Sequence, residues 1–423
     1  MNRFNNIAVI GAGISGLTIA RLIDKESSVT VFETSNRPGG LIKCDKINGC
    51  LFHTCGGHVW NTKNEEVSNF FWKHFNRETE FIKSDRNSTI FMPDGSIVPY
   101  PIENHLFKLG ENSLKQIISE LIAISNAQDE ALKYADFEDF LIKRFGRTLY
   151  ELYFRPYNEK IWRTDLYKIP ISWLEGKLPM PTPEEILYNN ILKIEEKSFV
   201  HSTFWYEKEN GSQFIADRLS ENLNIIYDSH IEKMTYTSNK WMINGSLFDA
   251  VIYTGNIREL PMALNGVDIG LFNDEILSLE SHGTTTVFCA LDKNPYSWIY
   301  LPDSKYNAHR IICTGNFSES NNTSGKFTGT IEFTDYLSYD DIIHQLKLIP
   351  LHPEYITHKF NPTTYPIQNS GTRKMISALK QKLSESNLFL CGRFAEWEYF
   401  NMDKAMESAI RLSLMLNNRQ WIS

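Results

Sequence analysis

The hydrophobic pattern divides the chain into regions with different predicted secondary structure. Near the N-terminus, an apolar run at 7–10 ends at a glycine, and a second apolar run at 29–32 follows a segment with helical character. Short apolar runs of this length, bounded by glycine and polar residues, predict buried strands. A strand, a glycine turn, a helix and a second strand together predict a βαβ unit, so we expect a parallel sheet here.

The middle of the chain has a mainly helical pattern. Apolar residues recur at helical spacing over 65–76, and further helical segments follow between 113 and 147. Prolines 179, 181 and 183 exclude a continuous helix, and we predict a flap there. The rest of the chain is predicted to contain helices at 214–219 and 401–410, and strands at 224–227, 231–234, 248–254, 284–291, 310–314, 329–333 and 389–393.

The first strand leads into a glycine motif with the spacing GxGxxG. Gly11 permits the tight turn, Gly13 lets the backbone approach a pyrophosphate, and Gly16 lets the next helix pack close to the strand. Ile14 and Ser15 open that helix, whose positive N-terminal end points at phosphate groups. We therefore predict a dinucleotide-binding site.

The residues after the second strand specify the dinucleotide further. Glu33 ends this strand, and a carboxylate there suits the two hydroxyls of an adenosine ribose. Arg37, Gly39 and Gly40 then complete an ExxxRxGG pattern that resembles the continuation found in FAD-binding oxidases. We predict FAD rather than NAD as the cofactor.

A second set of cofactor residues is predicted near the C-terminus. Gly392 ends an apolar strand and would let a cofactor approach closely, and Arg393 follows it. The next helix begins with Asn401, Met402 and Asp403, and its N-terminal end would stabilise negative charge on the pyrimidine side of a flavin. Helix capping explains Asn401 and Asp403 equally well.

A chain of 423 residues is long enough for two or three domains. We predict an α/β fold with a discontinuous, Rossmann-like FAD-binding domain of the GR2 type, formed by 1–60, 200–260 and 375–423. A helical domain with the flap is inserted at 61–199. An antiparallel β-sheet at 261–374 is predicted to form the substrate domain.

Composition and charge argue against several classes of protein. The net charge of −8 comes from interspersed acidic and basic residues, so no nucleic-acid partner is expected. The six cysteines occur singly without zinc-like spacing, so we expect them to be reduced. The first strand begins by Ile7 and no run of about 18 apolar residues occurs, which predicts neither a cleavable signal nor a membrane span. We expect a cytoplasmic enzyme.

Several segments in a defined order carry a closer resemblance. They are 56–62 (Gly-Gly-His-Val-Trp-Asn-Thr), 156–165 (Pro-Tyr-Asn-Glu-Lys-Ile-Trp-Arg-Thr-Asp), 309–312, 364–367, 392–393 and 398–403. In these segments, which span nearly the whole chain, the sequence resembles UDP-galactopyranose mutase. That family is similar in its dinucleotide motifs to the wider group of amine-oxidase and protoporphyrinogen-oxidase flavoproteins.

The resemblance implies an isomerase that uses a redox cofactor without net redox change. Members of the family interconvert the pyranose and furanose forms of a UDP-linked galactose for cell-surface polysaccharide biosynthesis, through an adduct between the sugar and N5 of reduced FAD. A nucleotide-sugar substrate and a reductant such as NAD(P)H are therefore implied as partners. The chain is also compatible with a homo-oligomer.

The matching motifs assign individual residues. By this resemblance, His58 holds the reduced flavin and orients the sugar, and Arg310 binds the diphosphate. The resemblance also implies four aromatic residues that contact the nucleotide sugar: Tyr157, Trp162, Tyr365 and Tyr399. It implies two further residues that contact the cofactor: Gly57 and Ile231.

Three departures from the family pattern leave an alternative open. Asn61 stands in place of a second histidine and Asn401 in place of an acidic residue. The flap arginine is missing, with Arg163 or Lys177 as candidates to replace it. Loss of one of two cations facing a diphosphate costs about 1.5–3 kcal/mol of charged hydrogen bonding. The alternative is an FAD-dependent oxidoreductase of the amine-oxidase or protoporphyrinogen-oxidase type.

Overall fold

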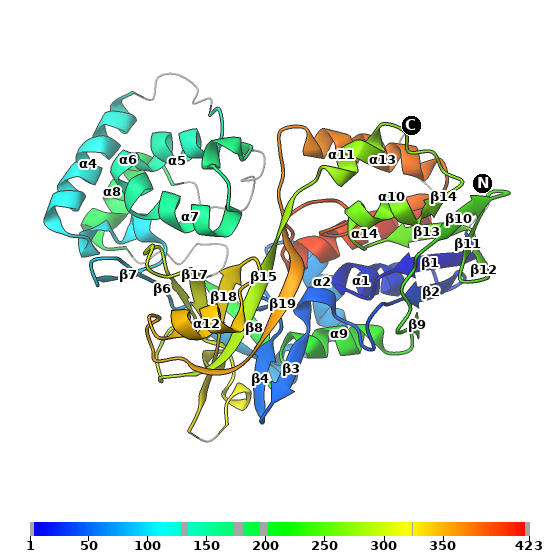
Figure 1. Cartoon of the computed structure of the whole chain (residues 1–423), viewed down its shortest axis with the longest axis horizontal. Helices are drawn as coiled ribbons and strands as arrows, with labels where there is room; N and C mark the ends of the chain where they lie inside the picture. Colours follow the sequence, from blue (N-terminus) through cyan, green and yellow to red (C-terminus); the bar gives the residue numbers. More distant parts are fainter. Residues whose placement is uncertain (1–3, 128–133, 172–180, 195–201, 324, 419–423) are drawn as a thin grey trace.

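The structure is a computed structural model that describes residues 4–127, 134–171, 181–194, 202–323 and 325–418. Figure 1 shows a parallel sheet with its helices on one side of the molecule, a large antiparallel sheet in the middle, and a group of helices on the other side. Most of the predicted flap, at 172–180, lies outside the described residues.

The parallel sheet forms where the apolar runs of the N-terminal pattern predict it. All of its neighbouring strands run parallel, in the order β20 (Leu388–Leu390), β13 (Ala250–Tyr253), β1 (Asn6–Ile10), β2 (Ser28–Phe32), β9 (Asn224–Ile226). In β1, Ile7 and Val9 pack into one apolar cluster and Ala8 into another, because successive side chains point to opposite faces. Both faces are therefore covered, as expected for a parallel sheet.

Helices from distant parts of the sequence cover these two faces. One face is covered by α1 (Ile14–Leu22), α9 (Ser212–Ser220) and α14 (Met402–Asn418). The other is covered by α10 (Leu260–Ala263), α11 (Phe272–Leu277) and α13 (Thr372–Ser384). The helix near the N-terminus and the one near the C-terminus thus share one layer, α1 beside α14 (Figure 1).

The large sheet carries side chains that lie at the candidate active site described below. Its strands are ordered β19 (Glu354–Pro366), β15 (Ser281–Leu291), β18 (Phe327–Thr334), β17 (Ala308–Ile312), β16 (Trp298–Tyr300), β6 (Ser88–Phe91), β7 (Ile97–Pro99). Neighbours are antiparallel except β16 and β6, which run parallel. Tyr300 pairs with Arg310, and Arg310 pairs with Glu332. Directly paired residues point to the same face, so these three side chains share one face.

The opposite face of the large sheet is packed against α12 (Tyr339–Leu346). Ile342 and Leu346 of this helix join Val287, Ile311 and Ile331 of the sheet in one buried cluster. The alternation of polar and apolar positions along β17 and β18 thus separates a face that packs against α12 from a face that carries charged groups.

The helical group packs against the far end of the large sheet. It contains α4 (Glu111–Asn126), α5 (Phe137–Phe145), α6 (Arg147–Leu149), a π-helical turn at Tyr150–Phe154, α7 (Arg155–Trp162) and α8 (Pro183–Leu192). Apolar residues of α4 and α5 share one buried cluster with Ile90 of β6 and Tyr300 of β16. This cluster joins the helices to the sheet that lines the site.

The remaining elements are short. They comprise a small sheet of β12 (Ser246–Phe248), β11 (Lys240–Ile243), β10 (Met234–Thr237) and β14 (Leu264–Asn265), the pairs β3 (Cys44–Ile47) with β4 (Cys50–His53) and β5 (Phe81–Asp85) with β8 (Thr203–Glu207), and helices α2 (Glu65–His74) and α3 (Arg77–Glu80). Within the described residues, every helix is too short or too polar to span a bilayer.

The fold class predicted from the sequence is confirmed: a Rossmann-like α/β unit is combined with helices and an antiparallel sheet. The strand predicted at 231–234 is wrong, because β10 begins only at Met234. The strands β6 and β7 lie within 61–199, the segment predicted as the helical domain, yet they extend the large sheet. The predicted domain boundaries stay a prediction.

Candidate active site

The loop between β1 and α1 forms a cradle of bare backbone. Gly11 has a φ of +104°, which L side chains rarely adopt, and a Cβ on Gly16 would lie 1.9 Å from the carbonyl oxygen of Gly11. Gly13 is the residue before α1, and it has no side chain that could cap that helix. The first N–H groups of α1 therefore remain available to a ligand.

A second glycine segment completes the cradle. The N–H of Gly39 donates to the carbonyl of Ala12 at 2.9 Å, and a Cβ on Gly40 would lie 3.2 Å from the Cα of Gly13. Glu33 at the end of β2 accepts hydrogen bonds from the N–H of Ala12 at 2.8 Å and of Ser35 at 2.9 Å. Added side chains would fill this space, which is what a close approach of backbone to a dinucleotide requires.

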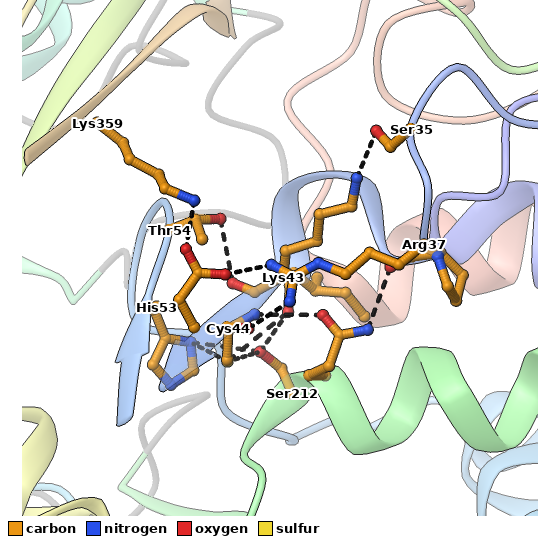
Figure 2. Close-up of polar contacts among 12 residues, drawn as sticks. Ser35, Arg37, Lys43, Cys44, His53, Thr54, Ser212 and Lys359 are labelled. Atoms are coloured by element: carbon orange, nitrogen blue, oxygen red, sulfur yellow. Dashed lines mark hydrogen bonds and ion pairs between the residues drawn. The ribbon is translucent and has the colours of Figure 1, made fainter. Parts of the chain in front are cut away.

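Arg37 points away from the cradle. Its guanidinium donates to the carboxylate of Asp45 and, at 3.1 Å, to the carbonyl of Cys44. Figure 2 shows Arg37 beside Lys43, whose ammonium group donates to the hydroxyl of Ser35 at 2.7 Å. The structure thus assigns the guanidinium of Arg37 to the β3–β4 hairpin, and Arg37 does not line the cavity described next.

A cavity of about 320 Å³ extends from the cradle toward the large sheet. It brings together most of the residues predicted for the cofactor and several predicted for the substrate: Gly11, Gly13, Ile14, Ser15, Glu33, Gly39, Gly40, Gly57, His58, Arg310, Tyr365, Arg393, Tyr399, Asn401 and Met402. Residues that are 300 or more positions apart in the sequence thus meet around one space. A long, narrow ligand that begins at the cradle would reach the charged face of the large sheet.

The C-terminal segment closes this cavity. Gly392 has a φ of +93°, and a Cβ there would lie 2.3 Å from the hydroxyl of Ser15, so glycine is needed for β20 to meet α1. Arg393 lies over the ring of Tyr399 at 4.3 Å and over that of Tyr365 at 5.7 Å. Asn401 and Met402, at the N-terminal end of α14, line the cavity, so a second helix terminus faces it.

A second cavity, of about 750 Å³, adjoins the first and shares part of its lining with it. The shared residues are Gly57, His58, Trp298, Arg310, Tyr399, Phe400, Asn401 and Met402. Asn61 and Asp403 line only the second cavity, and burial raises the pKa of the Asp403 carboxyl. The two spaces meet at His58 and Arg310, the residues predicted to act in catalysis.

One ring nitrogen of His58 is buried and has no partner among the described residues. This atom is Nε2, and no described residue forms a hydrogen bond with it. Burial, with a contribution from Arg393, lowers the pKa of His58 to about 4, so the ring is neutral at pH 7. An unpartnered buried nitrogen is costly unless a ligand satisfies it. This nitrogen and the glycine cradle together fit the flavin dinucleotide that the sequence predicts.

Arg310 is held by a buried ion pair. Its Nε donates to the carboxylate of Glu332, and its Nη2 donates to the hydroxyl of Tyr365 at 3.2 Å. Although burial opposes ionisation, Arg310 and His309 hold the pKa of Glu332 well below its usual range. Glu332 also accepts a hydrogen bond from the N–H of Gly56 at 2.7 Å, which ties Arg310 to the loop that carries His58.

Two of the predicted aromatic residues lie on α7, and the other two line the first cavity. The ring of Tyr157 meets that of Tyr300 edge to face at 5.4 Å, and Trp162 meets Tyr365 edge to face at 6.1 Å. Tyr365 and Tyr399 are stacked with ring planes 7° apart. Tyr157 and Trp162 themselves line neither cavity, so they contact the site through other aromatic rings.

Some candidates lie elsewhere. Ile231 precedes β10 and packs at the margin of the apolar cluster around α13, away from both cavities. Arg163 is exposed at the C-terminal end of α7, and Lys177 lies outside the described residues. Three further residues at the site are not predicted by any sequence pattern: Arg86, Trp298 and Glu332. Only the pairing of β6, β16, β17 and β18 brings them there.

Comparison with known proteins agrees with this geometry. Residues 9–75 match the NAD(P)-binding Rossmann-like domain. The chain is 22% identical to dTDP-fucopyranose mutase of Escherichia coli, over 98% of this chain and 100% of that protein. It is 21% identical to UDP-galactopyranose mutase of Mycoplasma genitalium, over 98% of this chain and 95% of that protein. The chain is mutase-like along its whole length.

Solved structures show the same fold. A crystal structure of reduced UDP-galactopyranose mutase superposes with a TM-score of 0.88, at 19% identity, over 98% of this chain and 94% of that one. A putrescine oxidase bound to putrescine superposes with a TM-score of 0.63, at 13% identity, over 98% of this chain and 99% of that one. The predicted resemblance and the prediction of an isomerase-type enzyme are thus confirmed, and the putrescine oxidase shares the fold.

Proposed function

We propose that this mutase-like chain interconverts the pyranose and furanose forms of a nucleotide-linked sugar, with UDP-galactose or dTDP-fucose as candidate substrates and the product used for surface glycans. Both full-length relatives are named as mutases of such sugars. The observation that carries the proposal is the meeting of two features in one cavity: the dinucleotide cradle, and Arg310 with Tyr365 and Tyr399. Reduced FAD bound in the cradle would supply the nucleophilic nitrogen N5.

Arg310, Tyr365 and Tyr399 are proposed to bind the diphosphate. Glu332 uses only the Nε side of the Arg310 guanidinium, which leaves N–H groups of this planar donor for phosphate oxygens. The hydroxyl of Tyr365 already lies 3.2 Å from Nη2 of Arg310, so the phenol and the guanidinium converge on one place. A diphosphate there would be a good leaving group because its negative charge is matched.

His58 is proposed to orient the cofactor and the sugar. Its neutral ring can place a hydrogen bond through Nε2 without adding positive charge. Gly57 beside it leaves space: a Cβ there would lie 2.6 Å from a methyl group of Ile312. Tyr157 and Trp162 line neither cavity, and they are proposed to support the aromatic side of the site through their contacts with Tyr300 and Tyr365.

The proposal is tested with the flavin-loaded protein reduced by dithionite under anaerobic conditions. UDP-galactofuranose and dTDP-fucofuranose are supplied separately, and the products are separated by chromatography. We expect the corresponding pyranose from at least one of the two, without net consumption of dithionite. The oxidised protein is the matched control and should convert neither sugar.

Two outcomes would contradict the proposal. If the fully reduced protein converts neither sugar, the proposed mutase activity is excluded. Oxygen-dependent turnover of an amine or a porphyrinogen with formation of peroxide would instead support the oxidoreductase alternative, which the likeness to the putrescine oxidase fold favours.

A further inference from the structure

The wall of the second cavity carries an arginine that the proposed function does not use. Arg86 lies just before β6 and lines this cavity together with His58, Asn61 and Trp298. It stands alone between β5 and β6 without a motif, so no sequence pattern predicts a role for it. Its importance follows from what surrounds its guanidinium.

Four contacts fix the position of the Arg86 side chain. Its Nε donates to the hydroxyl of Ser88 at 2.8 Å, and its Nη2 donates to the hydroxyl of Tyr300 at 2.6 Å. The guanidinium also lies over the ring of Trp298 at 4.7 Å and over that of Tyr100 at 5.7 Å. Stacking on two aromatic faces holds the flat guanidinium in one plane before any ligand arrives.

The charge of Arg86 is not matched within the described residues. A guanidinium has five N–H donors, and the two hydrogen bonds above use two of them. No carboxylate of the described chain forms a salt bridge with it. Several other cations of this cavity are matched, among them Arg373 by Glu398 at 2.5 Å and Lys404 by Glu407 at 2.7 Å.

The sheet register relates Arg86 to Arg310. Tyr300 accepts the hydrogen bond from Arg86 and is directly paired with Arg310 across β16 and β17. Tyr300 and Arg310 therefore point to the same face of the sheet, about 5 Å apart at the backbone. Arg86, held at the end of the Tyr300 ring, lies on that face too. Two guanidinium groups thus flank one stretch of the cavity wall.

We propose that Arg86 is a substrate-recognition residue that binds anionic oxygens of the nucleotide sugar through its remaining N–H groups. This inference rests on the proposed function. The oxygens belong to the diphosphate or to a carboxylate carried by the sugar ring, since the same planar donor suits both. In either case Arg86 supplies a second cation opposite the substrate, in addition to Arg310.

Arg86→Gln tests the proposal by direct binding. Dissociation constants of UDP, UDP-galactose and UDP-galacturonic acid are measured by calorimetry with the flavin-loaded protein. If Arg86 contacts the diphosphate, all three bind roughly 10- to 100-fold more weakly. If it contacts a sugar carboxylate, only UDP-galacturonic acid loses affinity, and the wild-type protein binds it more tightly than UDP-galactose. Arg86→Lys keeps the charge and should recover part of the loss.

Arg77→Gln is the matched control. Arg77 also stacks on aromatic rings, 4.6 Å from that of Trp72 and 5.5 Å from that of Trp205, but it lines neither cavity. It should bind all three ligands as the wild type does. Flavin content and circular dichroism of every variant should match the wild type.

The failures of the two proposals are distinguishable. Unchanged affinity of Arg86→Gln for all three ligands, with normal binding by the wild type, overturns the assignment of Arg86 and leaves the mutase proposal standing. Absence of binding of any UDP ligand to the wild-type protein overturns both.

Discussion

The glycine cradle and the charged wall of the large sheet are built in different ways. The cradle consists of backbone: Gly11, Gly13, Gly39 and Gly40 come from one stretch of the sequence and contribute space and N–H groups. The wall consists of side chains from strands far apart in the sequence, and its central feature is the buried pair of Arg310 and Glu332. The cradle therefore depends on residues that have no side chain, and the wall depends on an ion pair.

This difference determines how each region can fail. An added methyl group is enough to disturb the cradle, because backbone atoms cannot move aside cheaply. A change of one charge is enough to disturb the wall, because a buried ion without its partner is strongly unfavourable. Mutations of matched size in the two regions should therefore damage different properties: cofactor retention in the cradle, and stability together with substrate affinity in the wall.

The largest effect is expected from Glu332→Gln. The Glu332 side chain is 1% exposed, and its loss leaves the guanidinium of Arg310, whose side chain is 20% exposed, without a countercharge. We expect a loss of about 3–5 kcal/mol in the free energy of unfolding, measured with urea. Glu354→Gln is the control in the same sheet, because Glu354 is 73% exposed in its pair with Lys326 and should change stability by less than about 1 kcal/mol. If the two variants lost similar free energies of unfolding, burial of the carboxylate would not explain the effect of Glu332→Gln.

A slightly smaller loss of stability, with a large loss of cofactor, is expected from Gly16→Ala. The new Cβ would lie 1.9 Å from the carbonyl oxygen of Gly11, so α1 must shift away from β1. We expect a cost of about 3 kcal/mol and protein that is purified without the yellow colour of bound flavin. Absorption spectra after incubation with FAD measure the loss.

Gly110→Ala provides the control for this substitution. Gly110 precedes α4, its φ is −59°, and a Cβ there would meet nothing within 4 Å. It should retain flavin and unfold as the wild type does. Normal flavin retention by Gly16→Ala would show that the cradle tolerates an added methyl group, and the comparison of the two regions would fail.

The difference between the cradle and the wall also explains which parts of the fold and of the site the sequence predicts. The cradle and the Rossmann-like unit follow from local spacing, because the glycines, Glu33 and both strands lie within about one βαβ unit. Arg86, Glu332 and Trp298 reach the wall only through strand register, which one sequence does not contain. The strands β6 and β7 were missed for a related reason: they are short and lie in a segment with mainly helical spacing. Arg310 was found through resemblance to a family and not through its own pattern.

A third prediction concerns acid and His53, which is one of three histidines, with His58 and His309, whose pKa lies below the ordinary value. His53 is fully buried, its Nε2 lies 2.9 Å from the hydroxyl of Tyr206, and its Nδ1 lies 3.3 Å from that of Ser212. Burial lowers the pKa of His53 to about 3, below its ordinary value near 6.5. Between these two values the unfolded chain binds the proton and the folded chain does not, so the free energy of unfolding falls as the pH falls.

We expect His53 to account for about 2 kcal/mol of the stability lost between pH 6.5 and pH 4.5. Urea unfolding at several pH values measures this slope, and His53→Gln should flatten it. The depressed pKa of Glu332 acts with the same sign but only near and below the pKa of about 4.5 of an unfolded glutamate, so it does not produce the slope above that pH. Equal slopes for the variant and the wild type would assign the acid sensitivity to other groups.

The smallest effect is expected from a mutation of Arg37. This residue lies at the edge of the cradle, but its guanidinium is held by an ion pair, as that of Arg310 is in the charged wall (Figure 2). Its side chain is 36% exposed, and its guanidinium is paired with Asp45, which also pairs with Lys359. Exposed ion pairs contribute little, so Arg37→Gln should change both FAD affinity and stability by less than about 1 kcal/mol. FAD titration of the apoprotein measures the affinity. A tenfold or larger loss would instead mean that Arg37 leaves Asp45 to contact the cofactor, as the ExxxRxGG pattern predicts, and that the cradle depends on charge as well as on bare backbone.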